Sequence, residues 1–98
     1  MSGDLIAFVA RTDGTIAPLP ERRPSLEELQ EIVGGYIEVV ALRLRGRIVG
    51  QMIFNDDGRY RLPHNPAATF LAQCNGGIEP WDWIAGPAVV LSGRAMID

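Results

Sequence analysis

The sequence predicts a two-layer α+β fold, in which a mixed or antiparallel sheet of four to five strands is covered on one face by two helices. Three observations lead to this prediction. One segment carries a complete helix-capping signature, several short runs are rich in β-branched residues, and turns that contain glycine separate these runs. A chain of 98 residues has room for one hydrophobic core, so we expect a single domain over residues 1–98.

The chain begins with two predicted strands. A short apolar run over residues 5–10 ends before the turn sequence Asp13-Gly14, and a weaker second strand follows over residues 15–19. Pro18 and Pro20 have no backbone N–H group to donate to a neighbouring strand. We therefore expect the second strand to lie at an edge of the sheet.

The strongest local signature in the chain predicts a helix over residues 25–33. Ser25 and Glu28 have the spacing of a capping box, and Gly34 suits the left-handed residue that ends a helix. The apolar side chains of this segment recur at helical spacing, at Leu26, Leu29, Ile32 and Val33. This apolar stripe predicts that the helix is the main cover of the sheet, while the opposite sheet face stays partly open.

A β-hairpin is predicted next. Two runs of strand-forming residues, 36–44 and 47–54, are separated by a turn at residues 45–46. The alternation of polar and apolar residues is blurred at residues 39–40. This blurring predicts either a bulge or a strand that is buried on both faces.

The last part of the chain predicts a short strand, a helix and a buried strand. A turn that ends in glycine leads into a return strand over residues 59–62. Asn65 is a favourable N-cap and Pro66 occupies the first helical position, which together predict a second helix over residues 65–73. A final apolar run over residues 86–93 predicts a buried strand.

Four segments of this pattern resemble a small family of unknown function that occurs mostly in bacteriophages, other mobile elements and their bacterial hosts. The matching pattern reads L-x-x-L-Q-x-x-V-G-G-x-I-E, N-x-x-G, N-x-x-A and I-x-G-x-x-x-V, here at residues 26–38, 55–58, 65–68 and 84–90. Residues 43–47 and 80–83 depart from it. The resemblance implies a genomic setting, and it implies no reaction and no functional residues.

The composition excludes several classes of function. The formal net charge is −3, which argues against bulk nucleic-acid binding. All nine basic residues are arginines. The N-terminus lacks the basic segment of a signal peptide, and no apolar run reaches the roughly 20 residues that cross a bilayer. We therefore expect a cytoplasmic protein without a membrane partner, located in the host cytoplasm if a phage encodes it.

Few groups are suited to catalysis or metal binding. The one histidine, His64, and the one cysteine, Cys74, are ten residues apart and lack the spacing of a zinc site. The glycine pairs end helices, whereas a phosphate-binding loop would need to open one. We expect no metal, no cofactor, no catalytic residue and no enzymatic activity.

A first group of candidate binding residues consists of arginines. Their shared strand parity would place five of them on one face of the sheet: Arg43, Arg45, Arg47, Arg59 and Arg61. Such a face would bind phosphates or carboxylates. The alternative is a solvated face in an arginine-rich protein.

A second group consists of Trp81 and Trp83, which lie in a loop with Glu79 and Asp82. We expect these indoles to cap the end of the small core. The alternative is an exposed pair that stacks on a base or fills a pocket of a partner.

Three hypotheses of function follow. The first is a non-enzymatic phage or mobile-element accessory protein that binds a host protein or associates with itself, for example as a homodimer. The second is a protein that sequesters a small anionic ligand such as a nucleotide signal, on the basis of the arginines. The third is a minor hydrolase, which only the unassigned carboxylates suggest.

Overall fold

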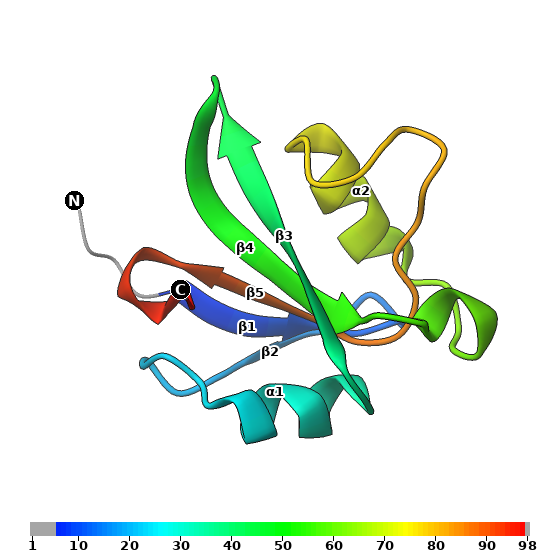
Figure 1. The fold of residues 1–98 in the computed structure, drawn as a ribbon, viewed down its shortest axis with the longest axis horizontal. Helices are drawn as coiled ribbons and strands as arrows, with labels where there is room; N and C mark the ends of the chain where they lie inside the picture. Colours follow the sequence, from blue (N-terminus) through cyan, green and yellow to red (C-terminus); the bar gives the residue numbers. More distant parts are fainter. Residues whose placement is uncertain (1–5, 98) are drawn as a thin grey trace.

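The computed structural model describes residues 6–97, which form one five-stranded sheet with a helix on either side (Figure 1). Its strands are β1 (Ile6–Ala10), β2 (Ile16–Pro18), β3 (Ile37–Leu44), β4 (Arg47–Asn55) and β5 (Ala88–Ser92). They lie in the order β2-β1-β5-β4-β3, and every neighbouring pair is antiparallel. The predicted α+β class and the number of strands are confirmed. The weak second strand lies at an edge, as its prolines require.

Two α-helices and two short 3₁₀ helices complete the fold: α1 (Leu26–Val33), α2 (Pro66–Cys74), η1 (Gly58–Tyr60) and η2 (Gly93–Ala95). Both predicted helix starts are confirmed. The Ser25 hydroxyl accepts from the Glu28 backbone N–H at 3.1 Å, and the Glu28 carboxylate accepts from the Ser25 N–H at 2.7 Å. Gly34 ends α1 with φ 82°, a left-handed conformation that glycine adopts without strain. None of the helices among the described residues is long and apolar enough to cross a membrane.

The two helices cover opposite faces of the sheet, so the prediction that both lie on one face is wrong. Leu29 and Val33 of α1 pack against Ile53 of β4, whereas Ala68 and Ala72 of α2 belong to the other side of the core. Figure 1 shows α1 below the sheet and α2 above it. The fold therefore has three layers, and no single face is left open along its whole length.

The reason lies in the central strands, which are buried on both faces. In β4, the neighbouring residues Met52 and Ile53 point to opposite faces, and neither is exposed. In β5, Val90 and Leu91 show the same pattern. Each face of such a strand needs a cover, and one helix of two turns can supply only one of them.

The hairpin of β3 and β4 contains a bulge, but not at residues 39–40. Those residues pair regularly with β4, and the register shifts between Leu42, which pairs with Gly50, and Arg43, which pairs with Ile48. Val49 is left without a partner and is the bulged residue. The blurred alternation at residues 39–40 instead reflects the position of β3 at the edge of the sheet, where Val39 is exposed.

The predicted return strand over residues 59–62 is also wrong, because the chain forms η1 there. The Asn55 side chain accepts from the Asp57 N–H at 3.0 Å, and the Leu62 N–H donates to the Gly58 carbonyl at 2.7 Å. These local bonds curl the chain away from the sheet. The arginines of this segment therefore do not extend the hairpin.

Candidate functional site

Asn65 ties the start of α2 to the rest of the molecule. It is fully buried; its Oδ1 accepts from the Ala68 N–H at 3.1 Å, as an N-cap does. Its Nδ2 donates to the carbonyls of Ala10 and Gly86, both at 2.9 Å. One side chain thus fixes α2 against the end of β1 and against the loop that enters β5.

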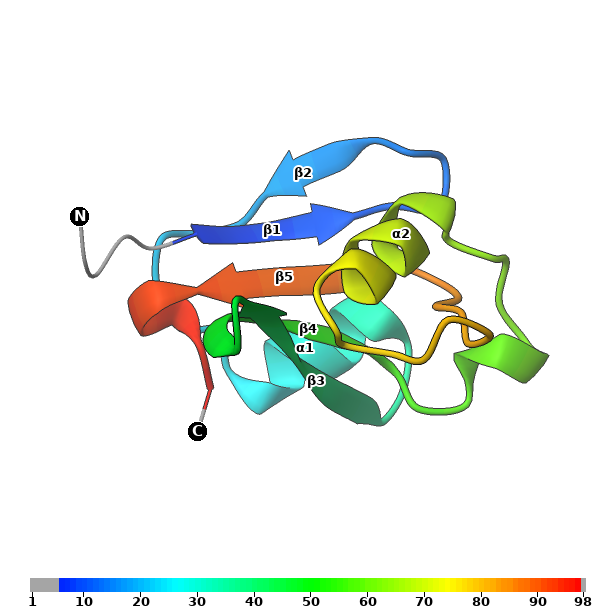
Figure 2. The same cartoon turned by 90° about the horizontal axis from the view of Figure 1, so that it is seen from above.

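Side chains of α2 also hold the loop between α2 and β5. Gln73 Nε2 donates to the carbonyls of Pro80 and Asp82, both at 3.0 Å. Thr69 Oγ1 accepts from the Ile84 N–H at 2.8 Å. These bonds fasten the loop along one side of the helix, and Figure 2 shows the orange loop running beside α2.

The fastened loop presents two indoles to solvent. Trp81 is 77% exposed and Trp83 is 41% exposed, so the expectation that both cap the core is wrong. They border an open hollow of about 400 Å³, which we call the tryptophan hollow; it is lined by His64, Thr69, Gln73, Trp81, Asp82 and Trp83. A large exposed apolar side chain is the unusual observation in a soluble domain, and a pair of them beside a hollow marks a candidate contact surface.

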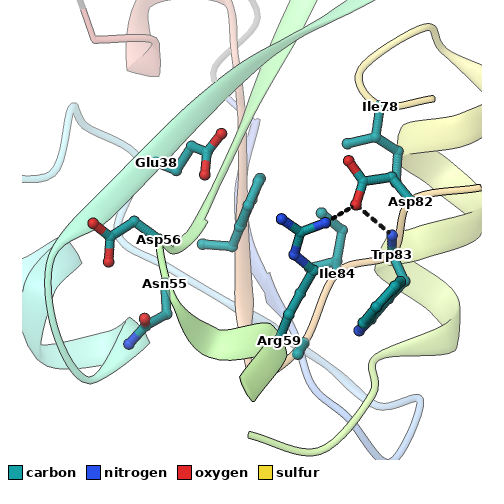
Figure 3. A pocket seen from close by; sticks show the side chains of 10 residues that line it. Glu38, Asn55, Asp56, Arg59, Ile78, Asp82, Trp83 and Ile84 are labelled. Carbon is teal, nitrogen blue, oxygen red and sulfur yellow. Dashed lines mark hydrogen bonds and ion pairs between the residues drawn. The ribbon is translucent and has the colours of Figure 1, made fainter. Parts of the chain in front are cut away.

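Arg59 and Asp82 brace the second indole (Figure 3). The Arg59 guanidinium forms an ion pair with the Asp82 carboxylate, and its central carbon lies 5.3 Å from the centre of the Trp83 ring. Asp82 Oδ1 also accepts from the Trp83 N–H at 3.1 Å. The structure therefore brings together one of the predicted arginines and one of the predicted tryptophans, in a cation–π contact.

A small cavity of about 50 Å³ lies behind this contact, between the hairpin and the loop. Three carboxylates and one guanidinium border it: those of Glu38, Asp56, Asp82 and Arg59. Figure 3 shows Glu38 and Asp56 on the side opposite Asp82. The lining of this cavity is therefore acidic, with three carboxylates against one guanidinium.

The five predicted arginines do not share a sheet face. Arg59 and Arg61 lie in and after η1, where Arg61 pairs with Asp57 at 2.9 Å and its hydrogen bonds hold the pKa of that carboxyl below its ordinary value. Arg43, Arg45 and Arg47 lie at the other end of β4, about 26 Å away at roughly 3.3 Å per residue. The single face of five arginines on which the sequestering hypothesis was based is therefore not formed.

The hydroxyl and imidazole beside the hollow serve the fold. His64 Nε2 lies 3.3 Å from Thr69 Oγ1, but that hydroxyl also bonds to the N–H and carbonyl of Ile84. With one proton, it can donate either to the Ile84 carbonyl or to His64. Cys74 is exposed at the end of α2. Over residues 6–97 no group of three or more His, Cys, Asp or Glu side chains could hold a metal ion.

The sequence predicted part of this site. It pointed to Trp81, Trp83 and Arg59, but it gave Gln73 no role, because the contact depends on how the loop folds back on α2. Asp82 could have been predicted as a site residue from its position between two tryptophans. Its carboxylate accepts from the Trp83 N–H and pairs with Arg59.

Comparison with known proteins gives a family and no activity. The family model for the "Domain of unknown function (DUF3846)" matches residues 6–96. No curated protein matches the chain, and no solved structure does.

Proposed function

The chain belongs to the DUF3846 family, whose function is unknown, and we propose that it is a non-enzymatic binding module that contacts a protein partner through Trp81 and Trp83. The proposal includes the setting that the sequence resemblance suggests: an accessory protein of a phage or mobile element that acts on a host protein, or on a copy of itself, in the host cytoplasm.

The exposure of Trp81 is the observation that carries this proposal. A tryptophan buries roughly 150–250 Å² when it is enclosed, at about 25 cal/mol per Å². Because Trp81 is 77% exposed, folding leaves most of that area in water. A partner that covered the ring would gain about 3–5 kcal/mol from this side chain before the costs of association. Tryptophans in such positions are enriched among the residues that dominate binding energy.

The site is rigid enough to bind without large rearrangement. The Gln73 amide holds the backbone on both sides of Trp81 through the carbonyls of Pro80 and Asp82. Arg59 stacks on Trp83 from the side of η1. A surface that is already ordered loses little conformational entropy on binding.

A binding role is also supported by the polar groups of the hollow. The Thr69 hydroxyl is engaged by the backbone of Ile84, and the Asp82 carboxylate is engaged by Arg59 and the Trp83 N–H. These groups position the loop, and the proposal assigns them no reaction.

The test is affinity capture from a lysate of the bacterium that carries the gene, with three forms of the full chain. We expect the wild type to retain a defined set of proteins and Trp81→Ser to lose them. Tyr60→Ser is the matched control, because Tyr60 is 82% exposed and does not line the tryptophan hollow. Melting curves establish that all three forms are folded. Equal capture by wild type and Trp81→Ser would refute the proposal, as would the absence of captured proteins together with a chain that does not associate with itself.

A further inference from the structure

The turn of the β3–β4 hairpin is a second exposed feature, and it is basic. Between residues 39 and 55 the only charged residues are Arg43, Arg45 and Arg47, and no acidic residue accompanies them. All three are exposed. The whole chain has a net charge of −3, so the rest of the molecule is more acidic than this total indicates. Charge is therefore segregated between the hairpin turn and the body of the domain.

The same turn also exposes aliphatic side chains. Leu44, Ile48 and Val49 are 59%, 55% and 45% exposed. We call residues 43–49 the hairpin tip. An exposed group of aliphatic and guanidinium side chains at the end of a hairpin is suited to a contact that buries both kinds of group.

The strand register distributes these side chains over both faces of the tip. Arg43 pairs with Ile48, and Leu44 pairs with Arg47, and paired residues lie on the same face of a sheet. Each face therefore carries one guanidinium and one aliphatic side chain, and Arg45 lies in the turn with φ 53°. Such a tip can offer a guanidinium and an aliphatic side chain to a partner from either face.

The tryptophan hollow has the complementary chemistry. Two indoles line it, together with His64, Thr69, Gln73 and Asp82. Asp82 is paired with Arg59, and the carboxylates of Glu38 and Asp56 line the adjoining cavity. The contact between Arg59 and Trp83 shows that a guanidinium already stacks on one of these indoles. A second guanidinium on Trp81 would add about 0.5–2 kcal/mol, depending on how far the contact is desolvated.

The base of the tip contacts the end of α2 of its own chain, where the Arg43 N–H donates to the Asn75 carbonyl at 2.7 Å, but the apex of the tip lies far from the η1 end of the hollow. The tip and η1 lie at opposite ends of β4, about 26 Å apart at roughly 3.3 Å per residue, and Arg59 of η1 stacks on the loop that forms the hollow. Figure 1 shows the hairpin turn at the top of the picture and the green segment after β4 at the lower right. A contact between Arg45 at the apex and the Arg59–Trp83 end of the hollow can therefore form only between molecules.

We infer that the occupant of the tryptophan hollow is the hairpin tip of a second copy of the chain. This inference rests on the proposed function, since it names the partner of the same surface. The contact is head-to-tail, because the tip of one copy meets the hollow of the next. An open assembly leaves a free tip at one end and a free hollow at the other, unless it closes into a ring.

The test measures the molar mass of the full chain by sedimentation over a range of concentration and salt. We expect the mass to rise above that of a monomer with concentration, and to fall as salt screens the arginines. Arg45→Glu alters the tip and Trp81→Ser alters the hollow; each alone should weaken assembly by about tenfold or more. Arg94→Glu makes the same charge change in η2, which contributes no residue to the tip or to the lining of the hollow, and should assemble as the wild type does.

Mixing the two variants gives the sharpest result. Trp81→Ser retains an intact tip and Arg45→Glu retains an intact hollow, so a 1:1 mixture should form dimers and nothing larger. A monomeric wild type at all concentrations in low salt would overturn the inference, as would a mixture that stays monomeric or an Arg45→Glu variant that assembles normally. If assembly fails while Trp81-dependent capture of another protein persists, the proposed function stands and only the identity of the partner is wrong.

Discussion

Replacing Asn65 with aspartate separates two roles of this side chain. Asparagine and aspartate serve almost equally well as helix N-caps, so a residue that only caps α2 would tolerate the change. Asn65 also donates from Nδ2 to the carbonyls of Ala10 and Gly86, both at 2.9 Å. An ionised aspartate has no proton to donate, and its second oxygen would face both carbonyl oxygens inside a fully buried site.

The expected loss of stability is large. Each buried carbonyl that loses its donor costs about 1–3 kcal/mol, so the two carbonyls together cost about 2–6 kcal/mol. That is a substantial part of the roughly 5–15 kcal/mol by which a domain of this size is stable. At about 4–8 °C per kcal/mol, the melting temperature of Asn65→Asp should fall by at least about 8 °C at pH 7.

Thermal unfolding followed by circular dichroism checks this expectation, with Ser25→Asn as the control. Ser25 is an exposed cap whose side chain only accepts from Glu28, so exchanging one good N-cap for another should change the melting temperature little. In Asn65→Asp the two carbonyl oxygens disfavour the charged form of the introduced carboxyl, so they would raise its pKa in the folded state. The difference in melting temperature between wild type and Asn65→Asp should therefore shrink as the pH falls toward about 4. A melting temperature within about 2 °C of wild type at pH 7 would show that the Nδ2 bonds contribute nothing measurable.

Three further expectations concern the cap of α1, the core and one glycine. The hydrogen bonds from Arg22, and then those from Ser25, lower the pKa of Glu28 from 4.5 to about 2. The ionised Glu28 carboxylate therefore stabilises the fold above pH 4.5, and this contribution is lost as the pH falls toward 2. Between these pH values the stability of Glu28→Gln should fall less steeply than that of the wild type in an acid titration. Ile53 is fully buried under α1, so Ile53→Ala should cost about 2–5 kcal/mol in urea unfolding, and a smaller cost would mean that α1 collapses onto the gap. Gly86 has φ 77°, and a Cβ there would approach a Leu62 side-chain carbon to 2.6 Å. Gly86→Ala should therefore lower the melting temperature. An unchanged melting temperature would mean that neither the positive φ nor the contact with Leu62 restricts this position.

The sequence alone determined the elements whose stabilising contacts lie within a few residues. The capping box of Ser25 and Glu28 closes over three positions, and the cap of α2 pairs Asn65 with Ala68 over the same distance. Gly34 ends its helix through its own φ value. Such interactions depend on local spacing, which is visible in the order of residues, and they fixed both helix starts and the class of the fold.

Tertiary structure decided where those elements lie and which side chains meet. Arg43 and Arg59 are both odd-numbered, but this places them on one face only if both lie in strands of the same sheet. Arg59 lies in η1, outside the sheet. The exposure of Trp81 depends on Gln73, which reaches the loop from seven and nine residues away, and the second role of Asn65 depends on Ala10, 55 residues earlier. Both faces of β4 are buried because two helices that are distant in sequence pack on opposite sides. Contacts of this kind are set by the packing of whole elements, and the spacing of neighbouring residues carries no record of them.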